Sequence, residues 1–235
     1  MAVQIKRPGG ELASRPLHFF WIVDCSGSMY GEKMATVNHA IKETIPEMRE
    51  AAKENPNAQL MIQALKFSDG ASWVTAAPEK VENYSWADLT PAGLTDMGKA
   101  FDLLAAQLNM PPMPERALPP VLVLLSDGQP TDDYKKSLDK LMQLPWAKKS
   151  VRIAISIGQD ADDSVLAEFT GNMERVLQAN TPEALVKMIK WASTVASVVS
   201  APASRVAQEG GSDDNVALDT STIPTNDDIA ASDVW

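Results

Sequence analysis

The chain has 235 residues, a formal net charge of −10 and 45% hydrophobic residues, a composition that suits one folded α/β domain with a tail. Its single cysteine, Cys25, excludes an intramolecular disulfide and therefore a disulfide-stapled scaffold. The sequence has no dense Lys/Arg run, no apolar stretch long enough to cross a bilayer, and no apolar signal-peptide core in residues 1–15. We therefore expect a cytoplasmic protein whose partners are neither nucleic acids nor membranes.

Strands and helices alternate along the first 200 residues. Continuous or alternating apolar residues predict strands, whereas apolar residues at helical spacing predict helices. In chain order these are strand 17–24, helix 33–53, strands 59–67 and 72–77 joined by a turn at 68–70, helix 95–109, strand 121–126, helix 132–144, strand 151–158, helix 162–170, strand 175–178 and helix 182–198. This alternation predicts an α/β fold with a doubly wound, mostly parallel six-stranded sheet, helices on both faces and one antiparallel edge strand.

The last part of the sequence differs from the rest in charge. Residues 201–235 hold one arginine against seven acidic residues, a net charge of −6, and few large apolar side chains. We therefore expect an N-terminal extension (1–14), a folded domain (15–199) and an acidic disordered tail (200–235). The tail is either a solvated segment, a kinase substrate or docking segment, or an acidic ligand for a neighbouring molecule's metal site. Its candidate phosphorylation sites are Thr220, Ser221, Thr222 and Thr225.

Three oxygen-rich segments follow the predicted strands or open the helices beside them. Asp24, Ser26 and Ser28 alternate directly after the first strand, Thr95 opens a helix, and Asp127 follows strand 121–126. Ligands of doubly wound sheets lie beyond the carboxyl ends of the strands, so these side chains should converge. Hydroxyl and carboxylate oxygens are hard ligands, which favours Mg²⁺, with Mn²⁺ or Ca²⁺ as alternatives.

Other residues are expected to support this site. Asp96 could hold Thr95 or a water molecule in place. Gly27 should let the first loop bend tightly, and Gly128 belongs to the same surroundings. The acidic pair at 132–133 is predicted to cap and open a helix rather than to bind a second ion.

This set of residues resembles the metal-ion-dependent adhesion site (MIDAS) of von Willebrand factor A (VWA) domains, and the resemblance covers roughly residues 15–199. It implies that the hydroxyl groups coordinate the ion directly, that the aspartates act directly or through water, and that the sixth position is left to water or to a carboxylate of a ligand, for which a protein partner's acidic side chain is the natural candidate. The corresponding ligands here are Asp24, Ser26, Ser28, Thr95 and Asp127.

Three further stretches, within residues 7–17, 118–133 and 145–146, resemble bacterial TerY-type proteins of tellurite-resistance loci. That resemblance implies a stress-response phospho-signalling module with a Ser/Thr kinase and a PPM-type protein phosphatase. We accordingly predict a non-enzymatic, metal-dependent protein-interaction domain that acts as an adaptor or regulated component of such a module.

The alternative is a Mg²⁺-dependent phosphoryl-transfer enzyme with Asp24 as nucleophile. The sequence departs from that pattern, because Ser26 stands where aspartyl-phosphate hydrolases carry a second Asp. Strand 151–158 also runs into Gln159 rather than into a lysine. Direct tellurite chemistry would fall to Cys25, which has no His or Lys motif nearby and is expected to pack as a small apolar residue.

Overall fold

The first strand, β1 (Arg15–Asp24), lies inside a seven-stranded sheet because its residues from Leu17 onward are buried on both faces. The computed structural model describes residues 14–55 and 58–200. The strands parallel to β1 or to one another are β2 (Ala58–Ser68), β5 (Val121–Ser126), β6 (Val151–Ile157) and β7 (Val176–Ala179). Two short strands, β3 (Gly70–Trp73) and β4 (Glu79–Lys80), pair antiparallel with β2. The order is β3-β2-β1-β5-β6-β7.

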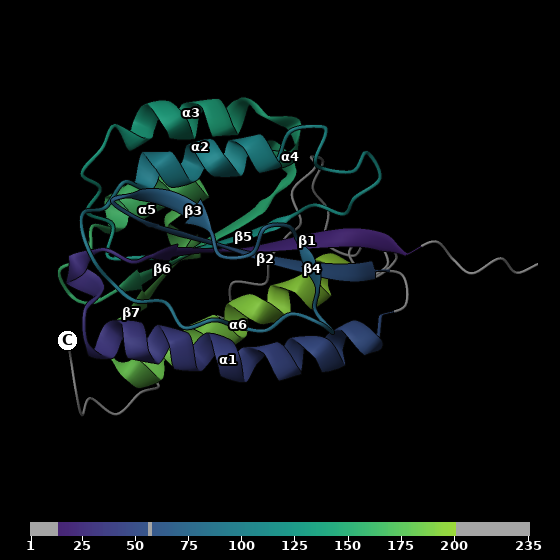
Figure 1. The fold of residues 1–235 in the computed structure, drawn as a ribbon, viewed down its shortest axis with the longest axis horizontal. Coiled ribbons are helices and arrows are strands. Elements are labelled where there is room, and N and C mark those ends of the chain that lie inside the picture. Colours follow the sequence, from purple (N-terminus) through teal and green to yellow (C-terminus); the bar gives the residue numbers. More distant parts are fainter. Residues whose placement is uncertain (1–13, 56–57, 201–235) are drawn as a thin grey trace, which may run out of the picture.

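Helices cover both faces of the sheet (Figure 1). One face carries α1 (Glu32–Lys53) and α6 (Pro182–Ser200). The other carries α2 (Met97–Gln107), α3 (Tyr134–Gln143), α4 (Pro145–Lys149) and α5 (Asp163–Thr170). Alternate residues of β1 enter the two cores: Phe19 and Trp21 pack in the α1–α6 layer, and Phe20 and Ile22 in the α2–α3 layer. Hydrophobic burial on both faces is therefore what fixes this strand in the middle.

The carboxyl ends of the parallel strands meet at one edge. Val23 of β1 is paired with Leu125 of β5, so Asp24 and Ser126 emerge side by side where the two strands end. The short 3-10 helix Gly27–Met29 then turns the chain into α1. This edge is where the sequence places its oxygen-rich segments.

The predicted α/β architecture with a mostly parallel sheet is confirmed, but the sheet has seven strands rather than six, because β4 as well as β3 pairs antiparallel with β2. Four elements of the described residues were not predicted, because none is long enough to show a periodic pattern: β4 with two residues, α4 with five, and the 3-10 helices Gly27–Met29 and Met173–Arg175 with three each. The helices predicted from residues 95 and 132 begin two residues later, at Met97 and Tyr134, because the polar residues before them form loops. None of the described helices is long and apolar enough to span a membrane. The predicted extension and tail, with Thr220, Ser221, Thr222 and Thr225, lie almost entirely outside the described residues.

Candidate metal centre

Asp24 lies at the bottom of the candidate site, with none of its surface exposed. Its Oδ1 atom accepts a hydrogen bond from the backbone N–H of Ser26 at 2.8 Å, and its Oδ2 atom accepts one from Ser126 Oγ at 2.6 Å. Ser126 Oγ in turn accepts a hydrogen bond from the backbone N–H of Gly128 at 2.9 Å. Asp24 thus joins the loop after β1 to the loop after β5.

Burial raises the pKa of Asp24 to about 6. The hydrogen bonds from Ser126 and Ser26 oppose this rise, and the nearby negative charge of Asp127 adds to it. Two carboxylates with little access to water repel each other, and a divalent cation between them would relieve that repulsion.

Two serine hydroxyls converge above Asp24. The Oγ atoms of Ser26 and Ser28 lie 2.9 Å apart. Ser26 is buried and Ser28 is exposed, so the pair runs from the interior toward solvent. The 3-10 turn that starts at Gly27 brings the two side chains to the same side of the loop.

Thr95, which is 5% exposed, is held by Thr131 from the loop after β5. The backbone N–H of Thr95 donates to Thr131 Oγ1 at 3.0 Å, and the backbone N–H of Thr131 donates to Thr95 O at 2.9 Å. Thr131 Oγ1 lies 3.5 Å from Asp96 Oδ1, whose second oxygen accepts from the N–H of Gly70 at 2.9 Å. Asp96 therefore supports Thr95 through Thr131 and through the β2–β3 turn.

Backbone hydrogen bonds also join the loop of Thr95 to the loop after β1. Ala92 N–H donates to Cys25 O at 2.7 Å, and Gly27 N–H donates to Gly93 O at 3.0 Å. Hydrogen bonds therefore join each of the three loops, after β1, before α2 and after β5, to the other two. The structure thus places the loops that carry the five predicted ligand residues together at one edge of the sheet.

Asp127 is the residue that most directly tests whether this site suits a cation. This residue is 3% exposed, and its Oδ1 atom is buried without a hydrogen-bond partner among the described residues. A buried carboxylate oxygen without a partner is unfavourable unless a cation or another donor satisfies it. The described residues contain no group of three or more His, Cys, Asp or Glu side chains suited to a metal ion. The serine and threonine hydroxyls would have to complete a coordination shell, and such an all-oxygen set fits a hard divalent cation.

The two glycines of the site differ in what the backbone requires. Gly128 has φ +69°, and a Cβ atom at this position would lie 2.5 Å from the carbonyl oxygen of Asp162. Only glycine fits there without strain. Gly27 is not in the left-handed region, and a Cβ atom there would lie 3.4 Å from Gly93 O, which is an ordinary contact distance. The backbone therefore requires glycine at position 27 less strictly than the sequence pattern predicts.

Asp132 caps a helix other than the one that follows it. Its carboxylate accepts from the backbone N–H groups of Gly98 at 3.0 Å and Lys99 at 3.2 Å, in the first turn of α2. Asp133 precedes α3 without a side-chain capping bond. The capping role predicted for this pair is correct for Asp132, but the helix it caps is the one that begins beside Thr95.

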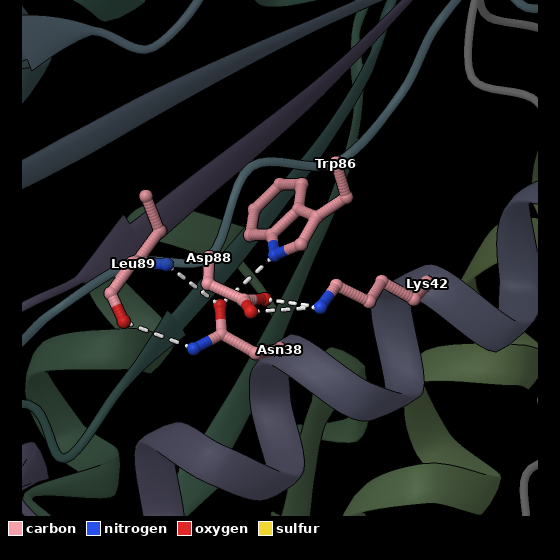
Figure 2. Close-up of polar contacts among 5 residues, drawn as sticks. All are labelled: Asn38, Lys42, Trp86, Asp88 and Leu89. Atoms are coloured by element: carbon pink, nitrogen blue, oxygen red, sulfur yellow. Dashed lines mark hydrogen bonds and ion pairs between the residues drawn. The ribbon is translucent and has the colours of Figure 1, made fainter.

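A second set of contacts fixes the long connection before α2 (Figure 2). Asn38 of α1 donates from Nδ2 to Leu89 O and accepts on Oδ1 from Leu89 N and from Trp86 Nε1, each at 2.9 Å. Lys42, one turn further along α1, pairs with Asp88 at 2.6 Å. These contacts tie the segment that leads to the Thr95 loop onto α1. Nothing in the sequence pattern indicates this role of Asn38, whereas Ser126 could have been suspected as the one polar residue of an apolar strand.

Cys25 packs in the core, as predicted. It is 2% exposed and free, and burial raises the pKa of its thiol to about 12, with Asp24 adding to the rise and Lys66 opposing it. A thiol with so high a pKa is a poor nucleophile at neutral pH.

A sequence model of the von Willebrand factor type A domain matches residues 20–191. The chain belongs to this family. VWA domains are commonly metal-dependent protein-interaction modules. A comparison with curated proteins gave no match.

Several solved structures share the VWA fold. The open pilus adhesin SpaC of Lactobacillus rhamnosus GG is 14% identical with a TM-score of 0.62, covering 79% of this chain and 30% of its own. A von Willebrand factor type A protein from Catenulispora acidiphila is 18% identical with a TM-score of 0.58, covering 79% and 43%. Proximal thread matrix protein 1 of the mussel byssus, with a zinc-occupied MIDAS motif, is 17% identical with a TM-score of 0.57, covering 80% and 47%. The match spans less than half of each of these chains.

Proposed function

We propose that this VWA domain is a non-enzymatic, metal-dependent protein-interaction domain. Mg²⁺, or alternatively Mn²⁺ or Ca²⁺, would be held by Asp24, Ser26, Ser28, Thr95 and Asp127. The unpartnered, buried Oδ1 atom of Asp127 carries this proposal, because a cation at this edge would satisfy it. The zinc in the MIDAS motif of the mussel protein supports a divalent ion at this kind of site.

The chemistry of the site favours an acidic partner. Three of the five ligand residues are uncharged hydroxyls, so the two carboxylates balance a divalent charge without exceeding it. A bound cation would supply Lewis-acid attraction for one further carboxylate. The protein residues themselves orient the ligand set, through the Asp24–Ser126 and Thr95–Thr131 hydrogen bonds, and keep Asp24 away from water.

The geometry does not favour the phosphoryl-transfer alternative. Asp24 is fully buried, and both of its oxygens accept hydrogen bonds, from Ser26 and Ser126. A nucleophilic carboxylate has to be accessible to its substrate, and a fully buried side chain is not. We therefore assign Asp24 to metal binding rather than to nucleophilic attack.

The wider role follows from the TerY-type resemblance of residues 7–17, 118–133 and 145–146. We infer that the domain serves in the bacterial cytoplasm as an adaptor or regulated component of a tellurite-resistance and stress phospho-signalling module. Its partners would be a Ser/Thr kinase and a PPM-type protein phosphatase, one of which offers the acidic side chain.

The test combines metal binding with partner capture. Calorimetry should show Mg²⁺ binding that is lost in Asp24→Ala and Thr95→Ala but kept in Ser72→Ala, an exposed hydroxyl on β3. Circular dichroism should show that all three variants stay folded. Tagged protein should then capture the kinase or phosphatase from its own lysate with Mg²⁺ but not with EDTA.

Two results would count against this function. Equal capture in Mg²⁺, in EDTA and by Asp24→Ala would show that the metal site does not bridge the partner. Turnover of a phosphate ester with Mg²⁺ that is lost in Asp24→Asn would support the enzyme instead.

A further inference from the structure

Two large apolar side chains stand exposed beside the candidate metal centre. Among the described residues four large hydrophobic side chains are strongly exposed, namely Tyr30 (80%), Leu94 (59%), Met110 (58%) and Met173 (56%). Tyr30 follows Ser28 by two residues, and Leu94 directly precedes Thr95. Half of these exposed groups therefore lie within two residues of a predicted metal ligand.

Backbone contacts place these two residues on adjoining loops. Gly27 N–H donates to Gly93 O at 3.0 Å, and Tyr30 N–H donates to Gly27 O at 3.2 Å. Leu94 N–H donates to Asp69 Oδ1 at 2.8 Å, which holds the backbone of the second loop. We call Tyr30 and Leu94 the rim pair. Exposed aromatic and aliphatic side chains next to a polar centre are typical of a binding surface.

A ligand for this surface needs a carboxylate next to apolar side chains. The chain itself contains such a segment at residues 226–235, where Asp228 is followed by Ile229 and Asp233 by Val234 and Trp235. We propose that segment 226–235 docks on its own domain, with one aspartate at the metal centre and its apolar neighbours against the rim pair. This inference rests on the proposed metal-binding function.

The segment has enough chain to reach the site. α6 begins three residues after β7, whose carboxyl end lies at the metal edge, and its 19 residues lead about 28 Å away from that edge at about 1.5 Å per residue. The 25 residues between Ser200 and Asn226 can span up to about 85 Å when extended. The return path is therefore several times shorter than the available chain.

Charge makes this docking dependent on metal. Residues 201–235 carry a net charge of −6, and the metal-free site presents the carboxylates of Asp24 and Asp127, so the two repel each other. A divalent cation would neutralise the two carboxylates, which removes this repulsion, and would leave a coordination position open for a third. A docked segment would occupy the position that an acidic partner needs, so the partner has to displace it. Binding of that partner is then regulated by the chain itself.

The experiment is NMR of the ¹⁵N-labelled full chain with Mn²⁺ in place of Mg²⁺, because paramagnetic Mn²⁺ broadens the resonances of nearby nuclei. We expect Mn²⁺ to broaden the loops at 24–31, 92–96 and 127–131 together with segment 226–235. Tyr30→Ala and Leu94→Ala should still bind Mn²⁺ in calorimetry, with an affinity lowered only by the loss of docking, and should lose most of the broadening of the segment. The matched controls are Met110→Ala and Met173→Ala, which remove exposed side chains outside the three loops and should keep it.

The outcomes separate this inference from the function on which it rests. Broadening of the three loops without segment 226–235 would overturn the docking and leave the metal site standing. Broadening of neither would overturn both. If broadening of the segment grows with protein concentration, the segment docks on a second copy of the chain instead of on its own domain. If the rim variants show the same broadening as the wild type, the rim pair does not bind the segment.

Discussion

The side-chain amide of Asn38 binds both the carbonyl and the N–H of Leu89, each at 2.9 Å, and so replaces a strand-like pair of backbone bonds. The two residues are 51 positions apart in the sequence. Leu89 lies three residues before Ala92. The backbone N–H of Ala92 donates a hydrogen bond to the carbonyl oxygen of Cys25 in the loop after β1. α1 therefore fixes the path of the chain into the Thr95 loop at a point just before the metal centre.

Asn38→Ala should loosen this path. The substitution removes three hydrogen bonds from a half-buried position, so the free energy of unfolding should fall by about 2–3 kcal/mol in urea titrations. Mg²⁺ affinity should fall by about tenfold, the effect typical of residues that orient metal ligands. The control is Lys42→Ala, which breaks only the exposed pair with Asp88 and should cost less than about 1 kcal/mol. Unchanged Mg²⁺ affinity in Asn38→Ala would show that the Thr95 loop keeps its position without the hydrogen bonds of Asn38.

Ser126→Ala should weaken metal binding more directly. The variant removes the hydrogen bond to Asp24 and leaves the N–H of Gly128 without its acceptor. We expect Mg²⁺ affinity to fall by about 10- to 100-fold in calorimetry. The matched control is Ser156→Ala, because Ser156 pairs with Ser126 in the sheet but bonds to Asp163 instead. Ser156→Ala should lose stability with no change in Mg²⁺ affinity, and an equal loss of affinity in both would mean that the sheet edge as a whole had moved.

The sheet and the positions of the ligand residues could be predicted from sequence because their signals are local. The apolar run of β1 ends at Asp24, and the alternation of Asp24, Ser26 and Ser28 follows at once. The supporting bonds could not be predicted in the same way. Ser126 and Asp24 are 102 residues apart, and only the parallel pairing of β1 with β5 brings them together.

The contacts that join the loops could not be predicted from the sequence either, because they form between residues that are close only in the folded chain. Asp132 reads as a cap for the helix that follows it, because a local pattern cannot reveal that α2 begins beside it in space. Asn38 looks like any polar residue on an amphipathic helix until the connection at 86–89 is folded against α1. Tertiary contacts decide the roles of these residues.

His18 should make the domain sensitive to acid. Both ring nitrogens are buried without hydrogen-bond partners among the described residues, and burial lowers its pKa from 6.5 to about 4. Well above pH 6.5 the ring is neutral in both the folded and the unfolded chain, so its titration does not affect the free energy of unfolding. As the pH falls from 6.5 toward 4, the unfolded chain takes up a proton that the folded protein does not. The free energy of unfolding should therefore fall by about 1.4 kcal/mol per pH unit, or about 3 kcal/mol in all.

His18→Phe removes this titration and keeps a ring that can stack on Phe20, which lies 6.0 Å away between ring centres. Urea unfolding at pH 6.5 and pH 5 should show a smaller loss of stability for the variant than for the wild type. The same loss in both proteins would place the cause of acid sensitivity in other groups.

Gly128→Ala should disturb the metal centre through its backbone. The left-handed φ of +69° and the 2.5 Å approach of a Cβ to Asp162 O force the loop after β5 to shift, and Asp127 shifts with it. We expect a loss of stability of about 1–3 kcal/mol in thermal or urea unfolding, together with weaker Mg²⁺ binding. Gly27→Ala is the matched control, because its φ is not left-handed and its Cβ would meet Gly93 O at an acceptable 3.4 Å. If Gly27→Ala lost as much Mg²⁺ affinity as Gly128→Ala, the loop after β1 rather than strain at Gly128 would set the geometry of the site.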